Sequence, residues 1–266
     1  MRRSGFLLAW LILGFVFLYV PIVLMVAMSF NDSRMTTVWT GVSLRWYRAL
    51  VNDPQLLRAA MLSLGIAAAS ASVATLLGGL AGLALARFAR IRLRSLFALL
   101  LAAPLVLPDL LLGVALLLLF VALERATGWP AGRGALTIVL AHATVGLAFV
   151  SGIVAARLAG GGIELEQAAA DLGAPPFTAF RRITLPMLAP ALGSGWLLAF
   201  VLSLDDVVIA SLVGGPGATT LPMQVFSALR LGPTPILNAL ATFILVLAAC
   251  LLFAAWKLGP ASRRLR

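Results

Sequence analysis

Three carboxylates, Asp109, Asp205 and Asp206, stand inside long apolar stretches of the sequence. The remaining acids lie in more polar connecting segments: Asp32, Asp53, Glu124, Glu164, Glu166 and Asp171. If the apolar stretches cross a bilayer, each carboxylate at that depth costs about 3 kcal/mol, so three of them require a compensating interaction. A positively charged ligand would compensate. The alternatives are pairing with a partner subunit and capping of backbone amides at a helix break.

The residues around these carboxylates indicate how each one could face a path for a cation. Asp109 follows two prolines, Pro104 and Pro108, and each proline frees the backbone carbonyl four residues before it. A kinked helix with free carbonyls beside a carboxylate is suited to line such a path. At helical spacing Asp206 shares a face with small residues, whereas Asp205 shares one with larger aliphatic residues. Asp206 is therefore predicted to face the path more directly than Asp205.

The sequence lacks the residues that an ATPase site or a metal site needs. A P-loop ATPase site requires a lysine followed by serine or threonine, and the only lysine, Lys257, is followed by Leu258. One histidine and one cysteine, His142 and Cys250, do not make a tetrahedral zinc site. We predict that the chain is not an enzyme and holds no cofactor or metal of its own. His142 is expected to form a buried hydrogen bond between helices, with a part in the substrate path as the alternative.

The composition determines which elements must carry these residues. Of 266 residues, 62% are hydrophobic and 11% are charged, and the mean hydropathy is +1.08. These values exclude a water-soluble or disordered chain and indicate an all-α polytopic membrane protein. Six apolar stretches reach the roughly 20 residues that a transmembrane helix needs: 6–28, 59–86, 96–123, 135–156, 187–213 and 236–256.

The basic residues predict the orientation of these six spans. Thirteen of the twenty Lys and Arg flank the spans on the side of both termini, and seven lie in the opposite loops. Positive charge is enriched on the cytoplasmic side of membrane proteins, so both termini are predicted to be cytoplasmic. The net charge of +11 is therefore an orientation signal, and no basic stripe with interleaved aromatic residues indicates a nucleic-acid partner.

The cytoplasmic connection over residues 159–186 has helix-ending signals of its own. Residues 164–172 are alanine-rich and predict a short helix, which Gly173 would end in the left-handed conformation. Pro175 and Pro176 prevent its continuation, and residues 177–184 predict a second short helix before the fifth span. The segment would form a compact protrusion that fits a groove on another protein.

This connection also carries a spaced motif. Gln167, Ala168, Ala169, Gly173, Ile183, Leu185 and Pro186 occupy the pattern Q-A-A-x3-G-x9-I-x-L-P. The pattern resembles the E-A-A-x3-G-x9-I-x-L-P loop of the membrane (permease) subunits of binding-protein-dependent ABC importers. The sequence departs from it at Gln167, where the family has Glu, although Glu166 is adjacent. Further segments resemble the polyamine (putrescine and spermidine) branch of that family: 30–33, 46–47, 104–109, 203–206 and 215–222.

The resemblance implies more than composition and spacing can show. It implies the ABC type I importer permease architecture, with residues 1–266 as one transmembrane permease domain and residues 159–186 as its ATPase-coupling loop. The implied function is a permease subunit of an ATP-driven polyamine importer, closest to the putrescine importers, in the bacterial inner membrane. The implied partners are a second permease subunit in a heterodimer, two ATPase subunits that bind ATP and Mg²⁺, and an extracytoplasmic substrate-binding protein. A permease for spermidine, an amino acid or a metal ion, or a secondary transporter, is the alternative.

Overall fold

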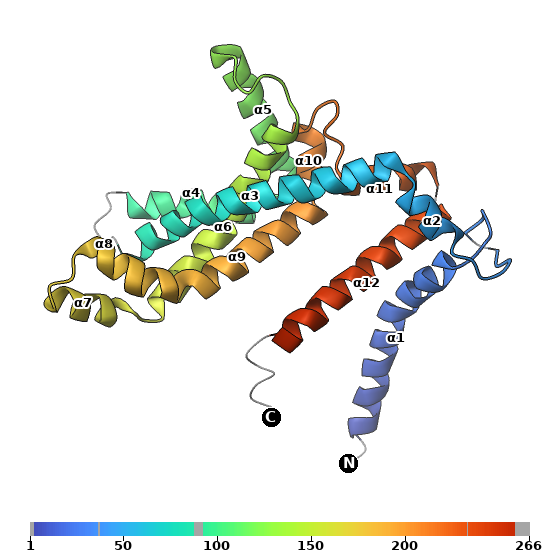
Figure 1. The fold of residues 1–266 in the computed structure, drawn as a ribbon, viewed down its shortest axis with the longest axis horizontal. Helices are drawn as coiled ribbons and strands as arrows, with labels where there is room; N and C mark the ends of the chain where they lie inside the picture. Colours follow the sequence, from blue (N-terminus) through green and yellow to red (C-terminus); the bar gives the residue numbers. More distant parts are fainter. Residues whose placement is uncertain (1–2, 37, 88–92, 233, 259–266) are drawn as a thin grey trace. The chain divides into compact units, whose positions relative to one another are not determined.

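A computed structural model of the chain describes residues 3–36, 38–87, 93–232 and 234–258. Within these ranges the regular elements are helices, with one isolated antiparallel bridge between Asn31 and Val42 (Figure 1). The helices are α1 (Arg3–Ser29), α2 (Arg45–Val51), α3 (Pro54–Arg87), α4 (Arg94–Val106), α5 (Asp109–Thr127), α6 (Ala135–Ala159), α7 (Ile163–Asp171), α8 (Pro176–Ala179), η1 (Phe180–Thr184), α9 (Leu185–Asp205), α10 (Val208–Val213), α11 (Leu221–Leu231) and α12 (Pro235–Leu258). Several basic residues of the orientation count lie outside the described residues: Arg2, Arg90, Arg92, Arg263, Arg264 and Arg266.

The chain forms two compact units, of which the first comprises Met1–Leu57 and Val225–Arg266. Within it, α12 packs against α1 and α2. The connection from α1 to α2 is organised by the buried Asn31, whose side chain donates to the carbonyl of Val38 (2.6 Å) and accepts from the amide of Thr40 (3.0 Å). The indole of Trp46 donates to the Asn31 carbonyl at 2.8 Å. The C-terminal end of α1 is therefore followed by a loop that internal hydrogen bonds hold in place.

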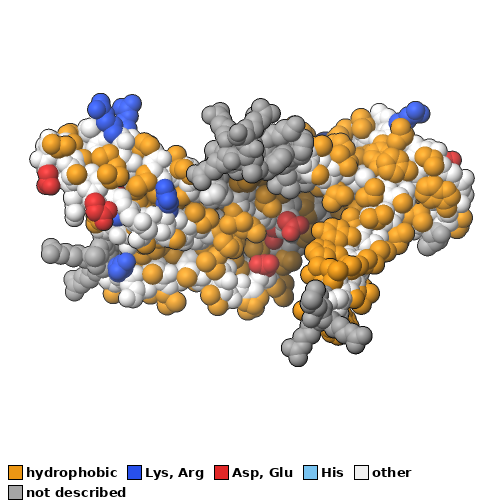
Figure 2. Space-filling view, turned by 90° about the horizontal axis from the view of Figure 1, so that it is seen from below, with side chains coloured by type: hydrophobic (Ala, Val, Ile, Leu, Met, Phe, Trp, Pro, Cys, Tyr) orange, Lys and Arg blue, Asp and Glu red, His pale blue; other side chains and the backbone are white. Residues whose placement is uncertain are grey.

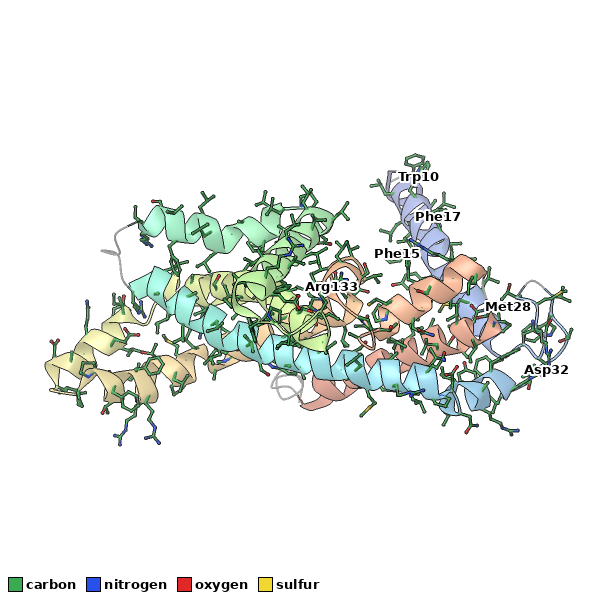
Figure 3. All side chains as sticks on the ribbon, turned by 90° about the horizontal axis from the view of Figure 1, so that it is seen from above. Trp10, Phe15, Phe17, Met28, Asp32 and Arg133 are labelled. Atoms are coloured by element: carbon green, nitrogen blue, oxygen red, sulfur yellow. The ribbon has the colours of Figure 1, made fainter. Side chains whose placement is uncertain are left out.

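The side chains of α1 are exposed along most of its length. Trp10, Phe15 and Phe17 project from the helix (Figure 3), and Phe17 is 79% exposed. Figure 2 likewise shows a mostly hydrophobic face, on which Lys, Arg, Asp and Glu form a few small groups. Apolar side chains on the outside of a helical protein are expected where the solvent is lipid.

The second unit, Arg58–Gln224, is built around α6. One buried cluster joins α6 to α3 and α9: Ala71, Ala74, Val150, Val154, Leu158, Leu188 and Ala199. Another joins α6 to α3, α5 and α10: Ile66, Leu112, Leu116, Phe120, Ile138, Ala141, Ile209, Ala210 and Val213, with Ala218 of the following loop. Small residues let the helix backbones approach closely. At Gly146, for example, a Cβ atom would lie 2.8 Å from Ala74 Cβ and 3.0 Å from Ala199 Cβ.

Two predicted spans are interrupted in the structure. The predicted helix over 96–123 is instead α4 and α5, separated at Leu107 and Pro108. Pro108 has no amide hydrogen and forces the residue before it out of the helical region, and Leu107 accordingly has ψ 135°. The predicted span over 187–213 likewise divides into α9 and α10 at Asp206, whose ψ is 129°. The sequence predicts one span at each place, with a kink near Pro108, whereas the structure has two separate helices at each.

Five helices among the described residues are long and apolar enough to cross a membrane, judged by length and composition: Gly5–Ser29, Pro54–Arg87, Asp109–Thr127, Ala135–Ala159 and Pro176–Asp205. The sixth predicted span corresponds to α12, in which the apolar stretch Pro235–Val246 is shorter than these five. The predicted second helix of the 159–186 connection is not separate, because α8 and η1 continue directly into α9. Six spans with cytoplasmic termini stay a prediction.

Candidate functional site

The two helix breaks lie at one cavity of the second unit. Its volume is about 430 Å³, within the range usual for small-ligand sites. It is lined by Pro104, Leu105, Leu107, Asp109, His142, Val145, Gly146, Phe149, Ala199, Leu202, Ser203, Asp205, Asp206, Val207, Val208 and Ile209. The described residues that line it thus include all three carboxylates singled out in the sequence and neither Lys nor Arg. The cavity is suited to a cation.

Two of the three carboxylates are free to bind a ligand. Asp109 is exposed in the first turn of α5, directly after the Pro108 break. Asp205 is exposed at the last position of α9. Neither carboxylate has a hydrogen-bond or ion-pair partner among the residues that the structure describes. Both are therefore available for charge-assisted hydrogen bonds.

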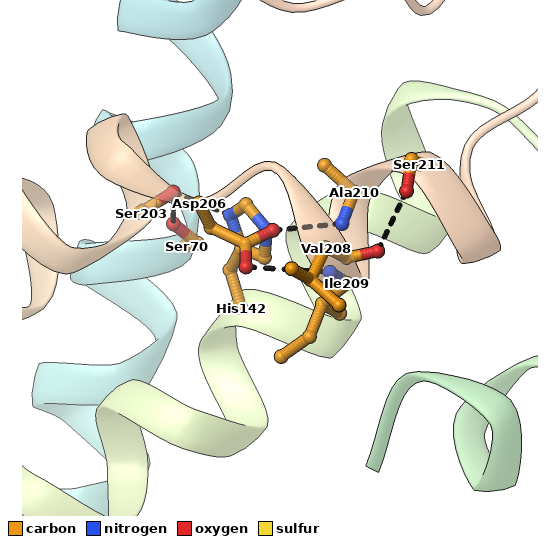
Figure 4. Close-up of polar contacts among 8 residues, drawn as sticks. All are labelled: Ser70, His142, Ser203, Asp206, Val208, Ile209, Ala210 and Ser211. Carbon is orange, nitrogen blue, oxygen red and sulfur yellow. Dashed lines mark hydrogen bonds and ion pairs between the residues drawn. The ribbon is translucent and has the colours of Figure 1, made fainter. Parts of the chain in front are cut away.

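Asp206 is held by several groups of the protein itself. Its Oδ2 accepts from the amide of Ala210 at 2.7 Å, and its Oδ1 accepts from the amide of Ile209 at 3.3 Å (Figure 4). These bonds satisfy amides at the start of α10, which explains locally why the helix breaks here. Oδ2 also lies 3.1 Å from Nε2 of His142, whose side chain is 3% exposed. The alternative of a carboxylate that caps a helix break is thus realised at Asp206.

A chain of hydrogen bonds continues from His142 across the unit. Nδ1 of His142 lies 2.6 Å from Oγ of Ser203, and Ser70 Oγ donates to Ser203 Oγ at 3.1 Å (Figure 4). The chain joins α3, α6 and α9, so the predicted interhelical hydrogen bond of His142 is confirmed. The sequence analysis did not identify Ser70. The signal available for Ser203 was its position three residues before Asp206 on the same face.

The first predicted helix of the 159–186 connection, over residues 164–172, is confirmed as α7. Gly173 has φ +79°, as predicted for the residue that ends it. The amide of Ala174 donates to the carbonyl of Ala169, and that of Gly173 to Ala170, both at 2.9 Å. These two bonds form a Schellman motif, in which the left-handed residue is normally glycine. Gln167 and Ala168 are exposed on α7, and Ala169 is half-buried.

Glu166 connects α7 to the two helices beside it. Its Oε1 lies 3.0 Å from Nη2 of Arg87 at the end of α3, and it accepts from the buried hydroxyl of Thr184 at 2.8 Å. Ile183 lies in η1, and Leu185 and Pro186 are the first residues of α9. The loop motif therefore extends from the exposed helix into a long helix of the second unit.

The described residues hold no group of three His, Cys, Asp or Glu side chains placed to bind a metal ion. The fold and the cavity define a helical membrane protein with an acidic, cation-suited cavity, which is the general form of a transport subunit.

The comparisons identify the family. The family model described as binding-protein-dependent transport system inner membrane component matches residues 74–259, and the chain belongs to this family. It is therefore an inner-membrane component of such a transport system.

Two curated relatives extend over nearly the whole chain. "Putrescine transport system permease protein PotI" of Escherichia coli (strain K12) is 52% identical over 264 residues, which cover 99% of this chain and 94% of the relative. "Spermidine/putrescine transport system permease protein PotC" of the same strain is 39% identical over 252 residues, covering 95% of this chain and 91% of the relative. The crystal structure of a bacterial ABC transporter involved in the import of the acidic polysaccharide alginate is similar in fold, with a TM-score of 0.70. The match covers 97% of this chain and 96% of that one at 16% identity.

Proposed function

We propose that the chain is the permease subunit of an ATP-driven polyamine importer, with putrescine as the foremost substrate. The observation that carries the proposal is the cavity, which three carboxylates line with no Lys or Arg among its described lining residues. The names of the two relatives supply the substrate class. In this proposal residues 1–266 form one permease domain with six spans and both termini in the cytoplasm.

The free carboxylates would contact the substrate directly. Asp109 and Asp205 are exposed and unpaired among the described residues, so they can accept hydrogen bonds from the ammonium groups of a diamine. Asp206 would contribute its negative charge to the path while it holds the α9–α10 break. This division reverses the expectation that Asp206 faces the path more directly than Asp205.

The coupling loop would connect the path to ATP hydrolysis. Its proposed residues are Glu166, Gln167, Ala168, Ala169, Gly173, Ile183, Leu185 and Pro186. Two side chains beside the Schellman turn are strongly exposed, Leu172 at 88% and Phe177 at 73%. Exposed apolar side chains of this kind suit burial against a partner, here one of two ATPase subunits that bind ATP and Mg²⁺. A second permease subunit and an extracytoplasmic binding protein would complete the importer.

Uptake of labelled putrescine into proteoliposomes that contain the whole importer tests the substrate. Hydrogen bonds to charged groups contribute about 1.5–3 kcal/mol, so Asp109→Asn with Asp205→Asn should lower uptake at least about tenfold. Asp32→Asn, in the exposed loop after α1, is the matched control and should leave uptake unchanged. Unlabelled spermidine as competitor ranks the two polyamines. Unimpaired uptake by the double variant would contradict the proposed cation path.

Co-purification of the ATPase tests the coupling loop. Valine at Gly173 must adopt φ +79°, which L residues with a branched side chain disfavour. Gly173→Val should release the ATPase from the purified complex. Gly217→Val is the matched control, because Gly217 has φ +80° and equally open space but lies outside the coupling loop. Retention of the ATPase by both variants would refute this assignment.

A further inference from the structure

The buried hydrogen-bond chain of Ser70, Ser203, His142 and Asp206 can be oriented from its chemistry. An ionised carboxylate only accepts hydrogen bonds, so Nε2 of His142 must carry the hydrogen that points to Asp206. In the neutral ring Nδ1 is then an acceptor, and it receives the hydroxyl hydrogen of Ser203 across 2.6 Å. The Ser70 hydroxyl lies 3.1 Å from Ser203 Oγ and also 3.1 Å from the carbonyl of Ala67, and it has one hydrogen to donate to either. In this arrangement Asp206, His142 and Ser203 are each satisfied.

The opposite direction of these hydrogen bonds, with a neutral His142 ring, leaves no hydrogen between His142 and Asp206. If Nδ1 of His142 carried the hydrogen, its unprotonated Nε2 would face Oδ2 of Asp206 across 3.1 Å, and both atoms would be acceptors. The buried ring would then lack a partner for Nε2 among the described residues, which is costly in a low-dielectric interior. The Asp206 carboxylate therefore selects the form of His142 that carries a hydrogen on Nε2, and the Ser203 hydroxyl completes the arrangement at Nδ1.

The location of this hydrogen-bond chain indicates what it does for Asp206. Ser70 is 1% exposed on α3, and His142 is 6% exposed on α6. Asp206 is only half-buried, and it lines the cavity together with Asp109 and Asp205. The chain thus runs from the packed centre of the unit to a carboxylate that stands at the α9–α10 break, where the backbone itself is not helical. The amides of Ile209 and Ala210 hold this carboxylate from α10, and His142 holds it from α6.

We infer that His142, oriented by Ser203 and Ser70, is a positioning residue that fixes the Asp206 carboxylate in the cavity wall. This inference rests on the proposed function for its consequence, the affinity of the cavity for a cation. It adds a role for residues that do not themselves need to touch the substrate. His142 acts through Asp206, so its contribution should disappear when Asp206 no longer carries a charge.

Transport kinetics of the whole importer with labelled putrescine supply the first test. His142→Leu removes both ring hydrogen bonds and should raise KM about tenfold or more, with a smaller change in kcat. His142→Gln can still donate and accept, and should restore most of the affinity. Ser203→Ala should raise KM in the same direction, whereas Ser211→Ala should not, because the only bond of the Ser211 hydroxyl within the described residues is to the Val208 carbonyl of its own helix (Figure 4).

A double-mutant cycle separates positioning from a general loss of structure. If His142 acts through Asp206, adding His142→Leu to Asp206→Asn should produce no further increase in KM. Multiplication of the two effects in a monodisperse, well-folded complex would overturn the inference. That result is distinct from failure of the proposed function, in which the unaltered importer itself would not transport putrescine.

The single histidine of the chain permits a test that does not require the substrate to be known. Histidine labelled with ¹⁵N in this subunit alone gives ring-nitrogen NMR signals from His142 only, since the sequence contains one His. We expect Nε2 of His142 to carry a hydrogen, and a changed ring-nitrogen spectrum in both Ser203→Ala and Asp206→Asn. The Nδ1–H tautomer, or a spectrum insensitive to both substitutions, would refute the inference even if another cation is transported.

Discussion

Replacing Gly82 with alanine should separate α3 from α6 and destabilise the unit that holds the cavity. A Cβ at this position would lie 2.6 Å from the Ser151 carbonyl oxygen and 2.8 Å from Val154 Cβ. Ordinary contact begins at 3.4 Å, so the two helices must move apart by about 0.8 Å. A gap of about this size forfeits a quarter to a half of the dispersion energy of each affected contact.

The magnitude follows from two opposing contributions. Overpacking of a well-packed interior costs about 1–3 kcal/mol, and the better helix propensity of alanine offsets about 0.5–1 kcal/mol of that. We expect a net loss of about 1–2 kcal/mol for Gly82→Ala. Gly65 on the same helix has nothing within 4 Å of its Cβ position, so Gly65→Ala should gain the propensity of about 0.5–1 kcal/mol alone.

Thermal denaturation in detergent, followed by fluorescence-detected size-exclusion chromatography, measures both variants. At about 2–4 °C per kcal/mol, Gly82→Ala should lower the midpoint by about 2–8 °C, and Gly65→Ala should raise it slightly. The opposite signs in one helix are the essential result. A rise in the midpoint for Gly82→Ala would refute the close approach of α3 and α6 on which the reasoning depends.

Two further predictions concern the ends of α3. Glu166→Gln removes the ion pair with Arg87 but keeps an acceptor for the Thr184 hydroxyl. We expect about a fivefold fall in putrescine transported per ATP hydrolysed, the equivalent of about 1 kcal/mol. Glu164→Gln on the same helix is the control. An equal ratio of putrescine transported to ATP hydrolysed in the two variants would contradict a role of the Glu166–Arg87 ion pair in coupling. At the other end, Asp53 accepts from two backbone amides in the first turn of α3. Asp53→Ala should therefore cost about 1 kcal/mol in the thermal assay, and Asp53→Asn little; equal midpoints for the two would argue against the cap.

Some features could be predicted from sequence because their causes are local. The length of apolar stretches depends on bilayer thickness, and the predicted helices over 59–86 and 135–156 agree with α3 and α6. Gly173 ends α7 because few other residues adopt φ +79° without strain. The coupling motif could be recognised because its residues follow one another within a single connection.

The two helix breaks show where hydropathy is an incomplete guide. Apolar character continues through Pro108 and through Val207, so a count of apolar residues registers one span at each place. Helix continuity depends instead on backbone hydrogen bonds, which Pro108 removes and the Asp206 carboxylate replaces. The sequence thus singled out three carboxylates that line one cavity, but it placed them within spans where the structure has helix breaks.

Which partners these carboxylates have was decided only by the tertiary structure. Asp206 meets His142 from 64 residues away, and Ser70 meets Ser203 across 133 residues. No local pattern encodes such a pairing, because it depends on how α3, α6 and α9 pack through their small residues. The amino-acid types and their order establish a helical membrane protein with a short helix in the 159–186 connection and three acids within apolar stretches. The packing leaves Asp109 and Asp205 without a side-chain partner among the described residues, while Asp206 is held in place.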